Sequence, residues 1–132
     1  MSELSELNET KSTFETLEVW KKARELRKEI SILTKALPSD ERFRLADQLV
    51  RASRSVTANI AEGHGRYHFQ ENIQFCRQAR GSLYEVLDHL TVALDENYIS
   101  EEEFNILKTK IFVVIKILNG YISYLKKRKG ME

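Results

Sequence analysis

Apolar residues recur at alternating spacings of three and four along four separate stretches of this chain, and this pattern constrains the fold more than any other feature. An α-helix has about 3.6 residues per turn, so such spacing places apolar side chains along one face of each helix. Short connections separate the stretches, which makes consecutive helices antiparallel neighbours. We therefore predict an all-α fold, an up-down-up-down antiparallel four-helix bundle. The predicted core positions are Val19, Ala23, Leu26, Ile30, Leu33 and Leu37 in the first helix, Ala46, Leu49, Ser53, Val56 and Ile60 in the second, Phe69, Ile73, Cys76, Leu83, Leu87, Leu90 and Leu94 in the third, and Phe104, Leu107, Ile111, Val114, Leu118, Tyr121 and Leu125 in the fourth.

Residues that stop or cap helices lie between these stretches. Pro38, the only proline, ends the first helix, and Ser39-Asp40-Glu41 offers capping side chains for the second. Gly63 and Gly65 are expected to end the second helix. A serine followed by three glutamates, residues 100–103, is typical of a capped helix start with an acidic first turn.

Composition favours one soluble, cytoplasmic domain. The 132 residues are 42% hydrophobic and 31% charged, which is typical of a folded, helix-rich chain. Cys76 is the only cysteine, so it has no partner for an internal disulfide, which suits a reducing compartment. The longest apolar run, residues 111–115, is far shorter than the ~20 residues that a membrane span needs. We expect no membrane partner.

Charge is segregated along the chain, although the net charge is only +1. Residues 1–18 carry five Glu and one Lys, whereas residues 19–80 carry thirteen Lys or Arg and seven Asp or Glu. On the first helix, four cations gather within about 60° of one another, opposite the apolar face. A row of cations predicts an anionic partner, whereas an ordinary solvated face with Glu25 and Glu29 beside it is the alternative. The cations expected to contact nucleic acid are Lys21, Arg24, Lys28, Lys35, Lys126, Lys127, Arg128 and Lys129.

Apolar residues outside the core pattern predict self-association. The run from Ile111 to Leu118 is apolar nearly all round the helix, and Leu17, Trp20 and Ile32 lie off the core face of the first helix. A wide core with a few exposed apolar side chains is the alternative. Four polar residues of the second helix point away from its core and are either solvated or in contact with a neighbouring subunit, namely Arg44, Arg51, Ser55 and Glu62. The predicted subunit interface is Trp20, Ile32, Arg51, Glu62, Phe112 and Ile115.

No residue pattern predicts an enzyme, a cofactor or a metal site. His64 and His68 flank the turn after the second helix, with Glu62 and Glu71 nearby, and we expect a surface turn with uncommitted imidazoles. Cys76 lies on a core face without an evident histidine partner, so it is expected to be structural. The chain also lacks a phosphate-binding glycine loop and paired zinc-ligand motifs.

Three stretches resemble a known family. They are FETLEVWKKARELRKEI at residues 14–30, ERFRLADQLVRASRSVTANIAEGHGR at 41–66 and ARGSLYEVLDHL at 79–90. They resemble the four-helix bundle proteins encoded within 23S rRNA intervening sequences, a family that also includes the accessory variability determinant proteins of diversity-generating retroelements. The likeness covers nearly everything beyond the first dozen residues.

The resemblance implies an assembly as well as a fold, namely a homopentameric barrel of four-helix bundles. It also implies that Arg51, Asn59, Glu62 and Gly63 occupy recurrent family positions. The chain departs from the family pattern where relatives typically have glycine and proline. It carries Arg44 and Thr57 there, and Thr57 restores an amide donor that proline lacks, which puts any helix kink in doubt.

We predict a non-enzymatic, oligomeric scaffold that binds structured RNA, and the resemblance implies an accessory role beside a retroelement reverse transcriptase. The alternatives are a 23S rRNA intervening-sequence protein of unknown role and a protein–protein interaction scaffold. Gene context would separate the family branches. Along the chain, residues 1–13 are expected to be a mobile acidic tail, residues 14–127 the bundle, and residues 128–132 the end of a basic tail.

Overall fold

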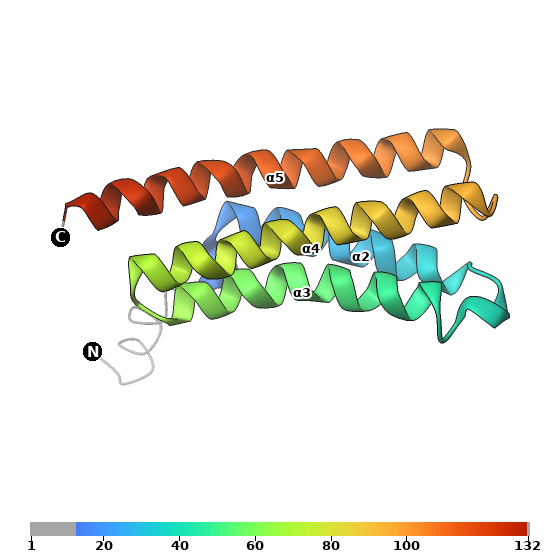
Figure 1. Cartoon of the computed structure of the whole chain (residues 1–132), viewed down its shortest axis with the longest axis horizontal. Helices are drawn as coiled ribbons and strands as arrows, with labels where there is room; N and C mark the ends of the chain where they lie inside the picture. Colours follow the sequence, from blue (N-terminus) through green and yellow to red (C-terminus); the bar gives the residue numbers. More distant parts are fainter. Residues whose placement is uncertain (1–12, 132) are drawn as a thin grey trace, which may run out of the picture.

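The computed structural model describes residues 13–131, which form helices joined by short turns (Figure 1). No strand occurs among these residues. This confirms the predicted all-α fold with four long helices. The elements are the 3₁₀ turn η1 (Phe14–Thr16), the helix α2 (Glu18–Lys35), the 3₁₀ turn η2 (Ser39–Glu41), and the helices α3 (Leu45–Gly65), α4 (Phe69–Asp95) and α5 (Glu101–Gly130).

Each helix packs against the helix before it and the helix after it, and α5 returns to contact α2. The backbones of α2 and α4 lie on one diagonal of the bundle, and those of α3 and α5 on the other. The antiparallel order is visible in contacts between α4 and α5. Asn72 Nδ2 donates to the Tyr121 hydroxyl, and Arg80 Nη1, further along α4, donates to Asn119, which lies earlier in α5.

The helices differ in length, with 18 residues in α2 and 30 in α5. At a rise of about 1.5 Å per residue, α5 is therefore about 18 Å longer than α2. Figure 1 shows the C-terminal end of α5 extending past the start of α2. The last turns of α5 consequently pack against α4 and face no residues of α2.

The core forms where the sequence pattern placed it. Most predicted core residues are buried, and Leu33, Leu37, Phe69, Leu87, Leu94 and Tyr121 are partly buried at its edge. Each helix has neighbours on two sides, so the buried stripe is wider than the strict three-and-four pattern. Further buried residues include Leu45, Ala52, Ala79, Val86, Ala93, Ile99 and Ile122.

One predicted helix start needs correction, whereas the predicted end of the second helix is confirmed. The residues Ser39–Glu41 form η2 and do not cap α3, which begins at Leu45 without a side-chain cap. The helix α3 ends at Gly65, and the chain turns at Tyr67, whose φ is 60°. At the fourth helix the predicted cap is present, since Glu103 N donates to Ser100 Oγ at 3.0 Å and the Glu103 carboxylate accepts from Ser100 N.

Gly63 is required by the close approach of α3 and α4. A Cβ atom at this position would lie 2.7 Å from Asn72 Oδ1 and 2.9 Å from Phe75 Cβ. Ser55 lies at the same helix pair, where its hydroxyl is 2.9 Å from Ser82 Oγ. Ser55 was expected to point away from its own bundle, and this is corrected by its contact with α4. Small residues on α3 therefore serve packing within the chain.

Thr57 links α3 to α2. Arg27 Nη1 donates to Thr57 Oγ1 at 2.9 Å, and the threonine is buried. The helix α3 runs through this position from Leu45 to Gly65. The hydroxyl at residue 57 thus supplies an acceptor that a proline at this position would lack.

Candidate nucleic-acid interface

Four exposed cations lie along the solvent face of α2, and we call Lys21, Arg24, Lys28 and Lys35 the α2 stripe. Their spacing of three, four and seven residues places them opposite the buried face of the helix. None of the four forms an ion pair with an acid within residues 13–131. The Arg24 guanidinium lies 5.6 Å from the centre of the Trp20 ring, and this cation–π contact holds the Arg24 side chain against the helix.

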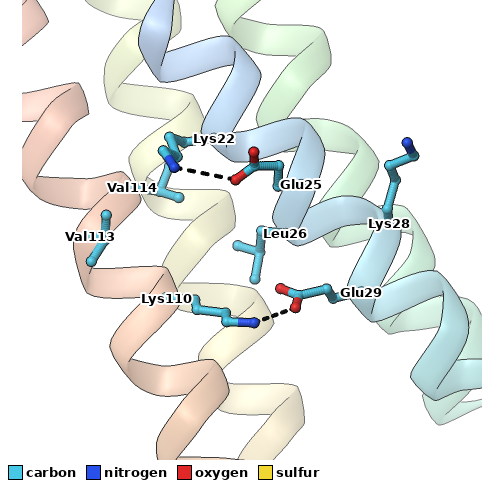
Figure 2. A pocket seen from close by; sticks show the side chains of 8 residues that line it. All are labelled: Lys22, Glu25, Leu26, Lys28, Glu29, Lys110, Val113 and Val114. Atoms are coloured by element: carbon cyan, nitrogen blue, oxygen red, sulfur yellow. Dashed lines mark hydrogen bonds and ion pairs between the residues drawn. The ribbon is translucent and has the colours of Figure 1, made fainter.

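The acids beside the α2 stripe are engaged elsewhere. Glu25 pairs with Lys22 at 3.4 Å, and Glu29 pairs with Lys110 of α5. Figure 2 shows both ion pairs at a groove between α2 and α5, while the Lys28 amine extends away from the groove. These pairs are partly exposed, so each is worth little to stability. The Glu29 carboxylate is thereby directed toward α5, whereas Glu25 pairs within α2 and still lies beside the stripe.

The groove between α2 and α5 has a volume of about 420 Å³ and an apolar floor. Leu26 and Val114 form the buried part of this floor, and Val113 lies at its exposed edge. Ile32 is 69% exposed on α2 and Phe112 is 41% exposed on α5, as predicted for surface apolar residues. Val113 was not among the predicted interface residues, and it is 45% exposed.

Two other predicted interface residues, Trp20 and Ile115, are covered by their own chain. The prediction that they are exposed to a neighbouring subunit therefore needs correction. Trp20 is 8% exposed because Phe14 of η1 packs on its ring, with 5.0 Å between ring centroids. Ile115 is 6% exposed within the bundle. Both therefore offer little surface to a neighbouring subunit. Arg51 and Glu62 are exposed, and Arg51 pairs with Asp47 of α3 while Glu62 pairs with Arg66 just after the end of α3.

The basic C-terminal residues are helical, which corrects the predicted tail at residues 128–132. The helix α5 continues to Gly130 and spreads its cations around its axis. The Arg128 guanidinium lies 5.8 Å from the Phe69 ring centre, whereas Lys126 and Lys129 turn toward α4. Residues 1–12 and 132 lie outside the described part of the chain. Thr13, assigned to the tail, accepts a hydrogen bond from Glu15 N and caps η1.

Lys126 and Lys129 line a groove with the first half of α4. The groove has a volume of about 410 Å³, and no acidic residue of the described chain lines it. Its lining residues are Gln70, Ile73, Arg77, Lys126, Lys129 and Gly130. We call this the α4–α5 groove. Arg77 was not predicted as a site residue, because only the pairing of α4 with α5 shows that it lies beside Lys126.

The acids around the turn after α3 face a cation, and the cysteine is buried. Arg66 lies between Glu62 and Glu71, with contacts of 3.1 and 3.8 Å, so both acids near His64 and His68 face a cation. No cluster of three or more potential metal ligands was found within residues 13–131. Burial raises the pKa of the Cys76 thiol to about 12, which keeps it protonated at neutral pH.

No helix in the described part of the chain combines the length and apolar character that crossing a membrane requires.

Comparisons with known proteins agree on the fold and family. The chain is similar to the crystal structure of a protein with unknown function from the S23 ribosomal protein family of Bacteroides thetaiotaomicron VPI-5482. The TM-score is 0.74 with 24% sequence identity, and the likeness covers 80% of this chain and 95% of the other. No curated protein matches the chain. The family model described as 23S rRNA-intervening sequence protein matches residues 15–120, from η1 into α5. The chain therefore belongs to the family of 23S rRNA-intervening sequence proteins.

Proposed function

We propose that this protein is a non-enzymatic, oligomeric scaffold that binds structured RNA through its backbone phosphates. The α2 stripe carries the proposal, because its four cations are exposed and lack acid partners among residues 13–131. From Lys21 to Lys35 the stripe spans about 21 Å along the helix.

The chemistry of α2 favours phosphate contacts over base recognition. Lysine and arginine bind phosphate oxygens by charge and hydrogen bonding, without reading sequence. The only aromatic residue of α2, Trp20, is buried beneath Arg24 and Phe14, so it has no free ring face for stacking a base. We therefore expect modest sequence preference and strong dependence on salt concentration.

The proposal assigns no catalytic step. The single cysteine is buried with its pKa raised to about 12, so it supplies no thiolate near neutral pH. The buried polar side chains Thr57, Asn72 and Ser82 have hydrogen-bond partners and serve packing. Function is accordingly assigned to the surface of the bundle.

Self-association is part of the proposal. Ile32 on α2 and Phe112 and Val113 on α5 are exposed apolar side chains, and Val113 lines the groove between these helices. Burying such residues in a subunit contact is favourable, at about 25 cal/mol per Å² of apolar surface. We propose that they help to close a ring, with five subunits as the family resemblance implies. A ring repeats the α2 stripe, which makes RNA binding multivalent.

Light scattering coupled to gel filtration tests this assembly. A mass several times the 15.4 kDa of one chain is expected. The Ile32→Glu and Val113→Glu double variant should shift the mass toward that of the monomer, because it places charge in the proposed contact. A parent protein that is monomeric at micromolar concentration would contradict the assembly and remove the multivalent argument.

RNA binding is tested by mobility shift across a salt series. Four phosphate contacts predict that affinity falls about 50- to 150-fold between 50 and 200 mM salt. The variant Lys21→Glu, Arg24→Glu, Lys28→Glu should weaken binding and flatten the salt dependence, while its oligomeric mass stays unchanged. The matched control reverses three exposed cations elsewhere, Arg54→Glu, Lys108→Glu and Lys116→Glu.

The result also separates two functions. If the stripe variant binds RNA as well as the parent does, the α2 stripe is a solvated face. The second candidate function, a protein–protein scaffold acting through exposed Ile32, Phe112 and Val113, would then take precedence.

If RNA binding holds, the accessory role beside a reverse transcriptase becomes a question of gene context. An adjacent reverse-transcriptase gene with a template repeat would support it, whereas location inside an rRNA gene would favour the intervening-sequence role.

A further inference from the structure

The α4–α5 groove is lined by hydrogen-bond donors and an apolar floor. Arg77 contributes a planar guanidinium, and Lys126 and Lys129 contribute ammonium groups. The Lys129 amine donates to Gln70 Oε1, which leaves the amide NH₂ of Gln70 as a further donor. Ile73 supplies the buried floor. A ligand that fits this lining carries negative charge and several acceptor oxygens, as a phosphate does.

The groove lies on a different side of the bundle from the α2 stripe. The helices α2 and α4 are diagonal partners without backbone contact, and the stripe points outward from α2. Because α2 and α5 are antiparallel, Lys21 near the start of α2 lies toward the same end of the bundle as Lys126 (Figure 1). The two basic surfaces thus share an end of the bundle but face different directions.

The neighbouring residues limit the site to the groove itself. One turn beyond Arg77, Arg80 Nη1 donates to Asn119 Oδ1 at 2.7 Å and is already engaged. The Arg128 guanidinium covers the Phe69 ring, so this aromatic face is not free to stack a base. Lys127 belongs to the same turn of α5 but does not line the groove. The set Arg77, Lys126 and Lys129 is therefore separate from the other cations at this end.

We propose that the α4–α5 groove is a second binding site for RNA backbone phosphates, so that one protomer holds two separate stretches of a folded RNA. This inference rests on the proposed function and adds a site on α4 and α5 to it. Arg77 spans two phosphate oxygens with its fork of donors, and Lys126 and Lys129 neutralise the adjacent phosphates. The two sites lie on different faces, so their contributions to binding should add.

Lysine footprinting of the full chain tests the groove. The protein is acetylated briefly with and without a stable RNA hairpin of unrelated sequence, and the modification of each lysine is measured by mass spectrometry. At about 90% occupancy, a lysine that is fully covered reacts about tenfold more slowly. We expect slower acetylation at Lys126 and Lys129 and at the stripe lysines, and little change at Lys127. Arg77→Glu should abolish protection of the two groove lysines and leave the stripe protected, whereas Lys116→Glu should change neither.

The possible outcomes separate this site from the proposed function. Protection of the stripe lysines alone would overturn the groove while leaving RNA binding by α2 intact. Equal protection of Lys127 with Lys126 and Lys129 would also overturn it, because general coverage of the end of α5 would explain both. No protection at any lysine would contradict the groove and RNA binding together. The inference is supported if the lysines of both sites are protected in the parent protein and only the stripe lysines are protected in the Arg77→Glu variant.

Discussion

Replacing Gly63 by alanine tests the packing that joins α3 to α4. The added Cβ would lie 2.7 Å from Asn72 Oδ1, 2.9 Å from Phe75 Cβ and 3.1 Å from the Asn72 carbonyl oxygen. Asn72 Oδ1 ends a short side chain that can rotate, but a Cβ atom and a carbonyl oxygen belong to the helix itself. The substitution therefore forces α3 and α4 apart by a few tenths of an ångström, and these two helices share the most extensive contact of the bundle.

Three effects set the size of the loss. Overpacking a dense helix pair costs about 1–3 kcal/mol. Moving Asn72 weakens its hydrogen bond to the Tyr121 hydroxyl, now 3.1 Å long, at about 1 kcal/mol. Alanine gains about 1 kcal/mol over glycine in helix propensity, which offsets part of this loss. The net expectation is a loss of about 2 kcal/mol, or about 6–10 °C in melting temperature for a domain of this size.

Gly81→Ala provides the matched control. Gly81 lies within α4, and a Cβ there would meet no atom within 4 Å. Helix propensity alone then predicts a gain of about 0.5–1 kcal/mol. Both variants are compared with the parent by thermal and urea unfolding at one protein concentration, because self-association would couple stability to concentration. If Gly63→Ala is as stable as Gly81→Ala, the close approach of α3 and α4 is not what requires glycine at residue 63.

Further predictions concern single side chains. Cys76 should resist a thiol reagent at pH 8 in the folded protein and react once urea unfolds it, since burial raises its pKa to about 12; rapid labelling of the native state would contradict this. Thr57→Val should cost about 1 kcal/mol by removing the acceptor for Arg27, measured by urea unfolding, and no loss would mean that Arg27 is equally well solvated. The hydrogen bond to Glu41 and, second, partial burial raise the pKa of Tyr98 to about 12. The stability that the protonated Tyr98 contributes to the folded protein is therefore complete below pH 10 and is lost between pH 10 and 12. Tyr98→Phe should remove that part of the alkaline loss.

Sequence periodicity could predict the bundle because each helix repeats its own pattern. Ile111 and Leu118 are buried as their spacing indicates, and the serine cap of α5 needs only residues within one turn. The end of α3 at Gly65 was also predicted, but the packing role of Gly63 was not, because it depends on Asn72 and Phe75 of the next helix. Features set by neighbouring elements are not visible to a pattern that treats each helix alone.

The same limit explains the errors at the candidate site. Trp20 lies off the core face of α2, but Phe14 of the preceding η1 turn covers it. Arg77 belongs to no pattern in its own helix, and it joins Lys126 only through the register of α4 on α5. The α2 stripe, by contrast, was found from sequence because all four cations share one helix face. Sites built on one element are predictable from spacing, whereas sites built between elements require the packing.

The contrast between α2 and α3 bears on whether the α2 stripe is an ordinary solvated face. Arg51 in α3 and Arg66 at its C-cap each pair with an acid four residues earlier, an arrangement that stabilises a helix by about 0.2–0.5 kcal/mol per pair. On α2, Arg24 instead has Lys21 three residues before it and Lys28 four residues after it, and like charges at these spacings destabilise a helix by similar amounts. If the charges of α2 served only to keep the protein soluble, the paired arrangement of α3 would serve equally well. The unpaired cations of α2 therefore lower the stability of the isolated helix, and an anionic partner that neutralises them would reverse that effect.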